Sequence, residues 1–330
     1  MIGAQTDRPS PGLVLTAGHG TRLRPLTALR AKPAVPVAGQ PLIRRILAWL
    51  AAQGLRDLVL NLHHRPETIT AAVGDGAGLG LRVRYSWEQP VLGTAGGPRH
   101  ALPLIDADRF WIVNGDTLTD VDLAAIERQH LRSGALVTMA LVPNPRPDRY
   151  GGVLVDGGWI TGFTAPGAER PAYHFIGVQL AESRVFADLA DNTPAESVSG
   201  IYRALIAGPA RRIGAFVSDA SFRDIGTPAD YLRTSLALSA AGSARPAAAS
   251  LIGARSRVSP RARLTRTVVW DDVTIDEGVT LTDCVVGDGV RLGAGLTLER
   301  RVIVPAGCAE PRATDEVAGD LLIAPLGEEA

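Results

Sequence analysis

The sequence is poor in several residue types, and each shortage excludes a class of protein. Only 2 of the 330 residues are cysteine, too few for a disulfide framework or a cysteine-ligated metal cluster. Acidic and basic residues balance at 34 each, which argues against broad binding to nucleic acid or to a membrane surface. No run reaches the roughly 18 apolar residues of a membrane span, and residues 1–12 lack an apolar signal core. We therefore expect a cytoplasmic protein that binds neither nucleic acid nor membrane.

The sequence contains a strand and a glycine-rich turn near its beginning. The apolar run at residues 13–15 predicts a buried strand, and Gly18 and Gly20 follow it. Glycine permits positive φ and a close approach of the backbone to a ligand. Successive backbone N–H groups in such a turn point at phosphate oxygens. The turn therefore predicts a phosphate site, beside which Arg22 and Arg24 add positive charge.

Lysine is almost absent from the chain. Lys32 is the one lysine among 34 basic residues, and all the others are arginine. An ammonium is a compact charge on a flexible stem, whereas a guanidinium is a planar fork. Chance retention of a surface lysine is one explanation. The position of Lys32, shortly after the glycine-rich turn, favours a charge that acts on the bound phosphates.

Residues 15–33 resemble the signature of the sugar-1-phosphate nucleotidyltransferases, also called NDP-sugar pyrophosphorylases. The resemblance covers roughly residues 1–235 and implies a site for a nucleoside triphosphate. It implies catalytic roles for Arg22 and Lys32. It also implies nucleotide contacts for Leu15, Ala17, Gly18, Gly20, Thr21 and Arg22.

Helical and strand patterns alternate after the turn. Apolar spacing predicts helices over residues 41–54 and 67–73 and strands over residues 58–60 and 81–85. We therefore expect an α/β domain with a Rossmann-like mixed sheet, mostly parallel, and helices on both faces. Ligands of such sheets bind at the carboxyl ends of the strands, which is where the glycine-rich turn lies.

A second glycine-containing loop spans residues 88–97 and leads into a predicted helix over residues 97–102. A loop that merely reverses the chain would have a similar composition. The family resemblance instead implies that Gly93 and Thr94 contact the nucleobase and that Glu88 recognises its edge. A carboxylate that accepts from N1–H and an exocyclic amine suits guanine, although the backbone offers another way to read the base.

Two aspartates are candidate ligands of Mg²⁺. The apolar run at residues 110–113 predicts a central strand, and Asn114 and Asp116 follow it. Mg²⁺ prefers carboxylate, water and phosphate oxygens; an aspartate that caps the next turn is the structural alternative. The resemblance implies a nucleotide contact for Asn114 and a catalytic, metal-binding role for Asp116. It implies that Asp224, in the Asp-Ile-Gly-Thr-Pro motif, is the second metal ligand.

The resemblance also implies a sugar-binding region. It assigns sugar contacts to Gly151, Gly177 and Glu196. Favourable charge at a helix N-terminus accounts equally well for Glu196. The Glu-Lys-Pro element of the family, whose lysine binds the sugar phosphate, is missing, because residues 163–166 read Phe-Thr-Ala-Pro. Arg170 and Arg203 are candidates to replace that lysine.

The C-terminal part has a different pattern. A helix over residues 229–238 would close a catalytic domain of residues 1–238, and residues 239–250, rich in Ala, Ser, Gly and Pro, form a predicted linker. Apolar residues then recur every six positions, which predicts a short left-handed parallel β-helix over residues 251–330. The series are Ile252, Val258 and Leu264; Val273, Val279 and Val285; and Val286, Leu292, Leu298 and Val304. We expect this domain to assemble a homo-oligomer or to regulate the enzyme.

Together these features predict a Mg²⁺-dependent enzyme that transfers a nucleoside monophosphate from a nucleoside triphosphate to a sugar 1-phosphate. GTP and mannose 1-phosphate are favoured, because residues 92–96 and the short β-helix resemble mannose-1-phosphate guanylyltransferases. A uridylyltransferase acting on N-acetylmuramate 1-phosphate or another hexose 1-phosphate is the alternative, which residues 37–43 resemble. A non-catalytic regulatory subunit of the same fold and, more weakly, a β-helix that also transfers an acyl group stay open.

Overall fold

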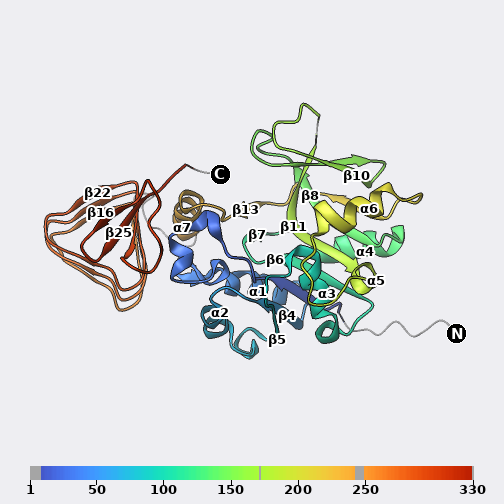
Figure 1. Ribbon diagram of the computed structural model, residues 1–330, viewed down its shortest axis with the longest axis horizontal. Coiled ribbons are helices and arrows are strands. Elements are labelled where there is room, and N and C mark those ends of the chain that lie inside the picture. Colours follow the sequence, from blue (N-terminus) through green and yellow to red (C-terminus); the bar gives the residue numbers. More distant parts are fainter. Residues whose placement is uncertain (1–8, 171, 242–248, 329–330) are drawn as a thin grey trace. The chain divides into compact units, whose positions relative to one another are not determined.

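Figure 1 shows the computed structural model of the chain, which describes residues 9–170, 172–241 and 249–328. The chain forms two compact units. The first contains residues up to Gly18 together with residues 44–222, and the second contains residues 19–43 together with residues from 223 onward. The predicted signature segment is thus divided after Gly18, and its later part belongs with the C-terminal strands. The division does not coincide with the predicted domain boundary at residue 238.

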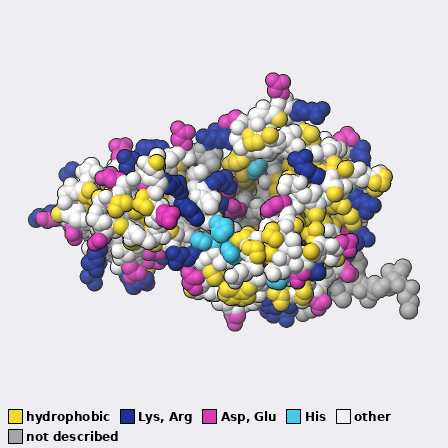
Figure 2. All heavy atoms as spheres, viewed as in Figure 1, with side chains coloured by type: hydrophobic (Ala, Val, Ile, Leu, Met, Phe, Trp, Pro, Cys, Tyr) yellow, Lys and Arg dark blue, Asp and Glu magenta, His cyan; other side chains and the backbone are white. Residues whose placement is uncertain are grey.

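The surface carries charges of both signs. Figure 2 shows acidic and basic side chains interspersed on the visible face, in keeping with a net charge of zero. Within the described ranges, no helix combines the length and the hydropathy that crossing a membrane requires.

The first unit is built on a nine-stranded mixed sheet, which confirms the predicted α/β class. In spatial order its strands are β5 (Arg82–Trp87), β4 (Asp57–Leu62), β1 (Gly12–Leu15), β6 (Arg109–Asn114), β11 (Tyr173–Glu182), β8 (Val137–Pro143), β12 (Ile213–Val217), β10 (Trp159–Thr164) and β9 (Gly152–Asp156). The first four are parallel to one another, and β11 is antiparallel to both β6 and β8. Strands β1 and β6 therefore end at the same edge, where ligands of such sheets bind.

The helices of this region are α1 (Leu42–Ala52), α2 (Pro66–Val73), α3 (Gly93–Ile105), α4 (Leu123–Ser133), α5 (Arg184–Ala187) and α6 (Tyr202–Ala207). Helix α3 begins at Gly93, so the predicted start at Gly97 is wrong. Because glycine is a poor helix former, the glycine-containing residues 93–97 are expected to form a loop rather than the first turn of the helix. In the structure the carbonyl of Ala195 accepts the N–H groups of Ala95 and Gly96. These bonds satisfy two donors that the first turn of a helix leaves open.

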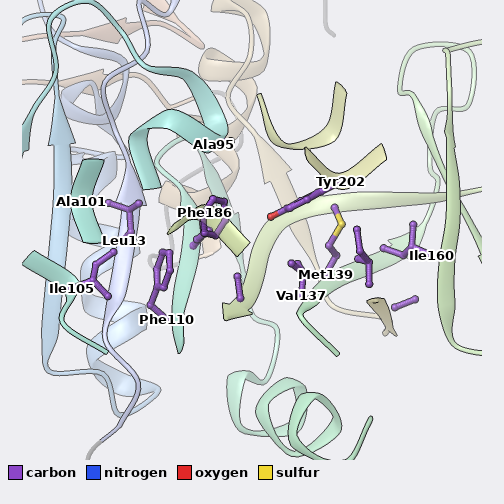
Figure 3. Close-up of a cluster of buried hydrophobic side chains, with 14 of the residues drawn as sticks. Leu13, Ala95, Ala101, Ile105, Phe110, Val137, Met139, Ile160, Phe186 and Tyr202 are labelled. Atoms are coloured by element: carbon purple, nitrogen blue, oxygen red, sulfur yellow. The ribbon is translucent and has the colours of Figure 1, made fainter. Parts of the chain in front are cut away.

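One hydrophobic cluster of the first unit lies on one face of the sheet. Val137 and Met139 of β8 belong to a cluster that also contains Phe186 of α5 and Tyr202 of α6 (Figure 3). Because successive residues of a strand point to opposite faces, Thr138 points the other way. Its hydroxyl is hydrogen-bonded to the buried side chain of His130 in α4, at 2.8 Å. Helices therefore cover both faces of the sheet, as the sequence predicts.

The second unit begins with short turns and includes one long helix. Residues 19–43 contain the 3₁₀ helices η1 (Thr21–Leu23), η2 (Leu26–Ala28) and η3 (Lys32–Ala34) and the strands β2 (Pro36–Val37) and β3 (Gln40–Pro41). Helix α7 (Pro228–Ala241) is longer than the predicted helix over residues 229–238. The Thr227 hydroxyl accepts the Asp230 N–H, and the Asp230 carboxylate accepts the Thr227 N–H, both at 3.2 Å. This reciprocal cap sets the start of α7.

The predicted linker is only partly described. Residues 239–241 are the last residues of α7, and residues 242–248 lie outside the described residues. The C-terminal strands start shortly afterwards at Leu251.

The C-terminal region contains three parallel sheets, an arrangement consistent with a β-helix. Their strands are β14 (Leu251–Ile252), β17 (Val268–Val269), β20 (Val285–Val286) and β23 (Arg301–Pro305); β15 (Arg257–Val258), β18 (Thr274–Ile275) and β21 (Arg291–Leu292); and β16 (Arg263–Thr265), β19 (Thr280–Thr282) and β22 (Thr297–Glu299). Each of the first three coils supplies one strand to each sheet, β23 adds a fourth strand to the first sheet, and equivalent positions such as Ser256 and Val273 are 17 residues apart. The left-handed sense and a role in assembly stay predictions.

The structure explains the breaks in the six-residue pattern and corrects the C-terminal bound of the predicted β-helix. Three six-residue steps make an 18-residue period, so a 17-residue coil shifts the phase by one position per turn. The middle coil therefore places Val269, Ile275 and Leu281 in its strands rather than Val273 and Val279. The parallel stacking also ends before residue 330, since β23 pairs antiparallel with β25 (Leu321–Pro325), which pairs antiparallel with β24 (Glu316–Ala318).

The core of the coils yields a prediction about stability. Leu281 is fully buried among the apolar residues of the stack, whereas Ile252 at its first coil is 46% exposed. We expect Leu281→Ala to lower the free energy of unfolding of this region by about 2–5 kcal/mol, because it leaves a cavity. Ile252→Ala should cost less than about 1 kcal/mol. Urea unfolding of both variants checks this, and equal losses would contradict the packing described here.

Candidate active site

Three charged side chains predicted for the site lie together in the second unit. The Nζ atom of Lys32 is 4.0 Å from Oδ1 of Asp224, and Nη2 of Arg22 is 3.9 Å from its Oδ2. The side chains of Lys32 and Asp224 are only 10% and 17% exposed, whereas that of Arg22 is 62% exposed. Two cations thus flank one carboxylate, and the surplus of positive charge suits phosphate groups.

Glycine makes the close packing of this cluster possible. Gly20 has a φ of 61°, and a Cβ atom on it would lie 2.8 Å from Cγ2 of Thr27 and 3.1 Å from Cβ of Lys32. A Cβ atom on Gly226 would lie 3.0 Å from Oδ2 of Asp224 and 3.2 Å from Nη1 of Arg22. Gly20 is therefore needed for its backbone conformation and for space, whether or not a ligand approaches it.

The first unit brings a second group of predicted residues to one edge of its sheet. Leu15, the last residue of β1, pairs with Asn114 of β6, and the Gly115 N–H donates to the Leu15 carbonyl at 3.0 Å. A Cβ atom on Gly115 would lie 2.5 Å from that carbonyl oxygen, so the two strand ends approach only because residue 115 is glycine. Asp116 follows, and the Thr117 hydroxyl lies 3.4 Å from its Oδ1. Leu15 and Asn114 thus lie side by side at the ends of neighbouring strands, with Asp116 two residues further along the chain.

Gly177 of β11 extends this group toward the predicted sugar region. Its φ is 76°, and it lies where the pairing of β11 with β8 shifts register. A Cβ atom on Gly177 would lie 2.8 Å from Nδ2 of Asn114. The structure therefore places a residue predicted to contact the sugar directly against one predicted to contact the nucleotide.

A buried hydrogen-bond network joins the residue after β1 to the loop before α3. Oδ1 of Asn61 accepts the Thr16 N–H at 2.6 Å, and its Nδ2 donates to Oε1 of Glu88 at 2.7 Å. Oε2 of Glu88 accepts the Leu92 N–H at 2.8 Å. Asn61 was missed by the sequence analysis; the available signal was an amide within an otherwise apolar buried run, residues 58–62.

Glu88 has a structural role in this network. The residue is 4% exposed, and both of its carboxylate oxygens accept hydrogen bonds from the protein. It therefore positions the loop that carries Leu92 and Gly93. Its contact with the edge of a base stays a prediction from the family resemblance.

Glu196 lies against the start of α3. Its Oε2 accepts a hydrogen bond from the Thr94 hydroxyl at 2.6 Å, and a Cβ atom on Gly93 would lie 2.6 Å from its Oε1. Glu196 also precedes the π-helical turn Ser197–Ile201 but makes no side-chain capping bond to it. The structure therefore brings Gly93 and Thr94, which are predicted to contact the base, together with Glu196, which is predicted to contact the sugar. A carboxylate is favourable beside the N-terminus of α3 on electrostatic grounds alone.

Three rings pack together next to Gly151. The ring centroids of Tyr150 and His174 are 4.4 Å apart, and those of His174 and Phe222 are 4.7 Å apart. Burial lowers the pKa of His174 from 6.5 to about 4. Among the described residues, none hydrogen-bonds its buried Nδ1 atom.

The candidates for a sugar-phosphate anchor are both exposed. Arg203 occupies an exposed position of α6, and Arg170 lies in the exposed segment between β10 and β11. Neither belongs to the groups of site residues described above, so the replacement for the missing lysine stays open.

Asp116 and Asp224 suit Mg²⁺ by the chemistry of their donor atoms. Mg²⁺ is usually held by one or two carboxylates together with phosphates and waters rather than by a dedicated cage of protein ligands. In keeping with this, the described ranges contain no group of three or more His, Cys, Asp or Glu side chains arranged for a metal ion. Each of the two carboxylates follows or ends a strand, which fixes its backbone.

Comparison with solved structures identifies the class of fold. The crystal structure of HddC from Yersinia pseudotuberculosis matches with a TM-score of 0.61 at 23% identity and covers 69% of this chain and 99% of that one. The structure of the same protein complexed with GMP-PN matches with a TM-score of 0.59. The chain therefore has the mixed α/β fold of these proteins.

Sequence comparison then identifies the family. A family model described as nucleotidyl transferase matches residues 11–240. Mannose-1-phosphate guanylyltransferase of Mycobacterium tuberculosis is 33% identical over 296 residues, which cover 87% of this chain and 82% of that protein. D-glycero-alpha-D-manno-heptose 1-phosphate guanylyltransferase of Aneurinibacillus thermoaerophilus is 30% identical over 221 residues, which cover 66% of this chain and 94% of that protein. N-acetylmuramate alpha-1-phosphate uridylyltransferase of Neisseria meningitidis is 44% identical over 34% of this chain and 49% of its own length. The chain belongs to the nucleotidyl transferase family, which confirms the resemblance seen in the sequence.

The pKa of His174 predicts a pH-dependent stability. Because its pKa in the folded protein is about 4, below the ordinary value of about 6.5, the unfolded chain binds more protons between these values. The free energy of unfolding should therefore fall as the pH drops from about 6.5 to about 4. We expect His174→Phe to reduce this dependence in urea unfolding, while a matched His64→Gln variant keeps it. An unchanged pH profile in His174→Phe would refute the assignment.

Proposed function

We propose that this protein transfers a nucleoside monophosphate from a nucleoside triphosphate to a sugar 1-phosphate and releases pyrophosphate. Membership of the nucleotidyl transferase family supports this reaction class. The observation that carries the proposal is the cluster of Lys32 and Arg22 around Asp224, beside the glycine-rich turn. Relatives that use mannose, heptose and N-acetylmuramate 1-phosphates support a sugar phosphate as acceptor.

Charge neutralisation and positioning account for the chemistry. The N–H groups of the turn at residues 18–21 and the exposed Arg22 would hold the β- and γ-phosphates. Lys32 would neutralise the charge that develops on the α-phosphate. The attacking sugar phosphate is already an anion, so the reaction needs no general base. Catalysis then rests on orientation and electrostatic stabilisation.

Mg²⁺ fits this proposal as the cofactor. Asp116 and Asp224 would hold the ion, which when bound offsets the negative charge of the reacting phosphates. Asn114 would support the nucleotide, while Gly177, Gly151 and Glu196 would line the sugar side. Contact of Gly177 with Asn114 supports this arrangement.

GTP and mannose 1-phosphate are the proposed substrates. Support comes from a mannose-1-phosphate guanylyltransferase that matches along most of both chains. A uridylyltransferase acting on N-acetylmuramate 1-phosphate is the second candidate, favoured by a higher identity over a shorter stretch. The missing Glu-Lys-Pro element keeps a regulatory subunit as a further candidate.

Substitution of the charged residues tests the reaction class. We expect Lys32→Ala and Asp116→Ala each to lower the rate of pyrophosphate release by about a hundredfold or more, since each removes a preorganised charge. Arg132→Ala, at an exposed position of α4, is the matched control and should keep the wild-type rate. Near-wild-type release by Lys32→Ala would overturn the proposal, and no release by the wild-type chain would favour a regulatory subunit.

A panel of nucleotides identifies the base. We expect GTP with Mg²⁺ to raise the melting temperature more than UTP, dTTP, ATP or CTP, because a ligand of the folded state stabilises it by RT ln(1 + [L]/Kd), which is largest for the nucleotide with the lowest Kd. Differential scanning fluorimetry with and without Mg²⁺ provides the measurement. A larger shift with UTP would replace the guanylyl assignment by the uridylyl one.

A further inference from the structure

Arg30 joins the segment of residues 19–43 to the C-terminal coils. Its Nε and Nη2 atoms donate to the two oxygens of Asp288 at 2.7 and 2.6 Å, and Nη2 also donates to Oδ2 of Asp271 at 2.7 Å. Asp271 and Asp288 are 17 residues apart and occupy the same position in successive coils. The planar guanidinium therefore bridges two coils through charge-assisted, partly bidentate bonds.

Buried aromatic residues complete this contact. The Arg30 guanidinium carbon lies 5.3 Å from the ring centroid of Trp270, a distance typical of cation–π contacts. Trp270 Nε1 donates to the Tyr231 hydroxyl at 2.7 Å, and that hydroxyl donates to the Pro36 carbonyl at 2.5 Å. Trp270 and Tyr231 are fully buried. The coils and α7 thus hold the segment at Arg30 and again at Pro36.

Leu29 adds an apolar contact beside Arg30. A Cβ atom on Gly287 would lie 2.5 Å from Cδ1 of Leu29. The third coil therefore has a glycine where Leu29 packs against it. Without a Cβ atom at Gly287, the Leu29 side chain comes close to the backbone of the coil.

The segment depends on such outside support because its own structure is weak. It contains three separate 3₁₀ turns and no α-helical turn before Leu42. Short 3₁₀ turns have poor hydrogen-bond geometry and few internal bonds. The segment nevertheless carries Arg22 and Lys32, and Lys32 follows Arg30 by two residues.

We propose that Arg30, clamped by Asp271 and Asp288, is a positioning residue for Arg22 and Lys32, so that the C-terminal coils form part of the catalytic machinery. This inference rests on the proposed function only for its kinetic consequence. The clamp itself concerns only how firmly residues 19–43 are held in one conformation. It differs from the predicted roles of the C-terminal region in assembly or regulation, because it acts within a single chain.

Kinetics of matched variants test the clamp. Arg30→Ala removes the fork and leaves two stacked carboxylates without their shared cation. We expect kcat for pyrophosphate release to fall about tenfold or more, because small displacements of catalytic groups are costly, while KM for the sugar phosphate changes little. Arg30→Lys, which keeps the charge without the planar fork, should lie between Arg30→Ala and wild type. Wild-type kcat in Arg30→Ala would overturn the proposal.

The chain offers a closely matched control. Arg255 makes a bidentate ion pair with Asp272 in the same coils, at 2.7 and 2.6 Å, but on an exposed surface. Arg255→Ala should therefore leave kcat within about twofold of wild type, as for other exposed ion pairs. An equal loss in Arg255→Ala and Arg30→Ala would mean that general destabilisation of the coils explains both, and would overturn the positioning role.

A mutant cycle separates positioning from direct contact with substrate. In a chain carrying Asp271→Asn and Asp288→Asn, the clamp is already weakened, so adding Arg30→Ala should lower kcat by much less than it does in wild type. If Arg30 touched the substrate itself, Arg30→Ala would lower kcat by the same factor in both backgrounds, and that result would overturn the proposal.

Hydrogen exchange tests the clamp without any activity. We expect amides of residues 19–43 to exchange several-fold faster in Arg30→Ala than in wild type or Arg255→Ala, while amides of residues 57–62 keep their rates. Unchanged exchange in residues 19–43 would refute the clamp. Faster exchange in a protein that releases no pyrophosphate with any nucleotide and sugar phosphate would refute the proposed function and leave the clamp established.

Discussion

A lysine ammonium that is almost buried needs an opposite charge beside it, and this requirement governs the second unit. Lys32 follows weak 3₁₀ turns, whereas Asp224 ends β13 (Phe222–Asp224) far later in the chain. Because an unpaired buried charge is costly, the packing of residues 19–43 and the start of α7 must keep the two side chains together. Arg30, two residues before Lys32, makes ion pairs of its own with Asp288 and Asp271.

The first unit depends on a different constraint, the close approach of backbones at the ends of its central strands. Gly115 and Gly177 both stand where a Cβ atom would collide, against Leu15 and Asn114. The buried Asn61 amide and Glu88 carboxylate then hold the next loop in place. Steric exclusion and satisfied buried polar groups therefore shape the group of candidate site residues in the first unit, whereas ion pairs shape the group in the second.

Prediction from the sequence succeeded where the signal is local. Strand β6 and helices α1 and α2 follow from apolar runs and helical spacing within a few positions of one another. It failed where a distant partner decides. The carbonyl of Ala195 moves the start of α3 to Gly93, and neighbouring coils impose a 17-residue period on a six-residue pattern. In both cases the deciding residues are too far away in the sequence to affect a prediction from local propensity.

The sequence by itself determined the reaction class and the fold class of this protein. The glycine-rich turn, the single lysine and the strand-end aspartates are local motifs, and the family resemblance predicts that they act on phosphates and a metal ion. Tertiary structure decided which groups meet. It joined Lys32 to Asp224, Glu88 to Asn61, and Arg30 to two successive coils. These contacts connect residues far apart in the chain, and only packing of the whole chain selects them, because charge and hydrogen-bonding capacity alone allow many other pairings.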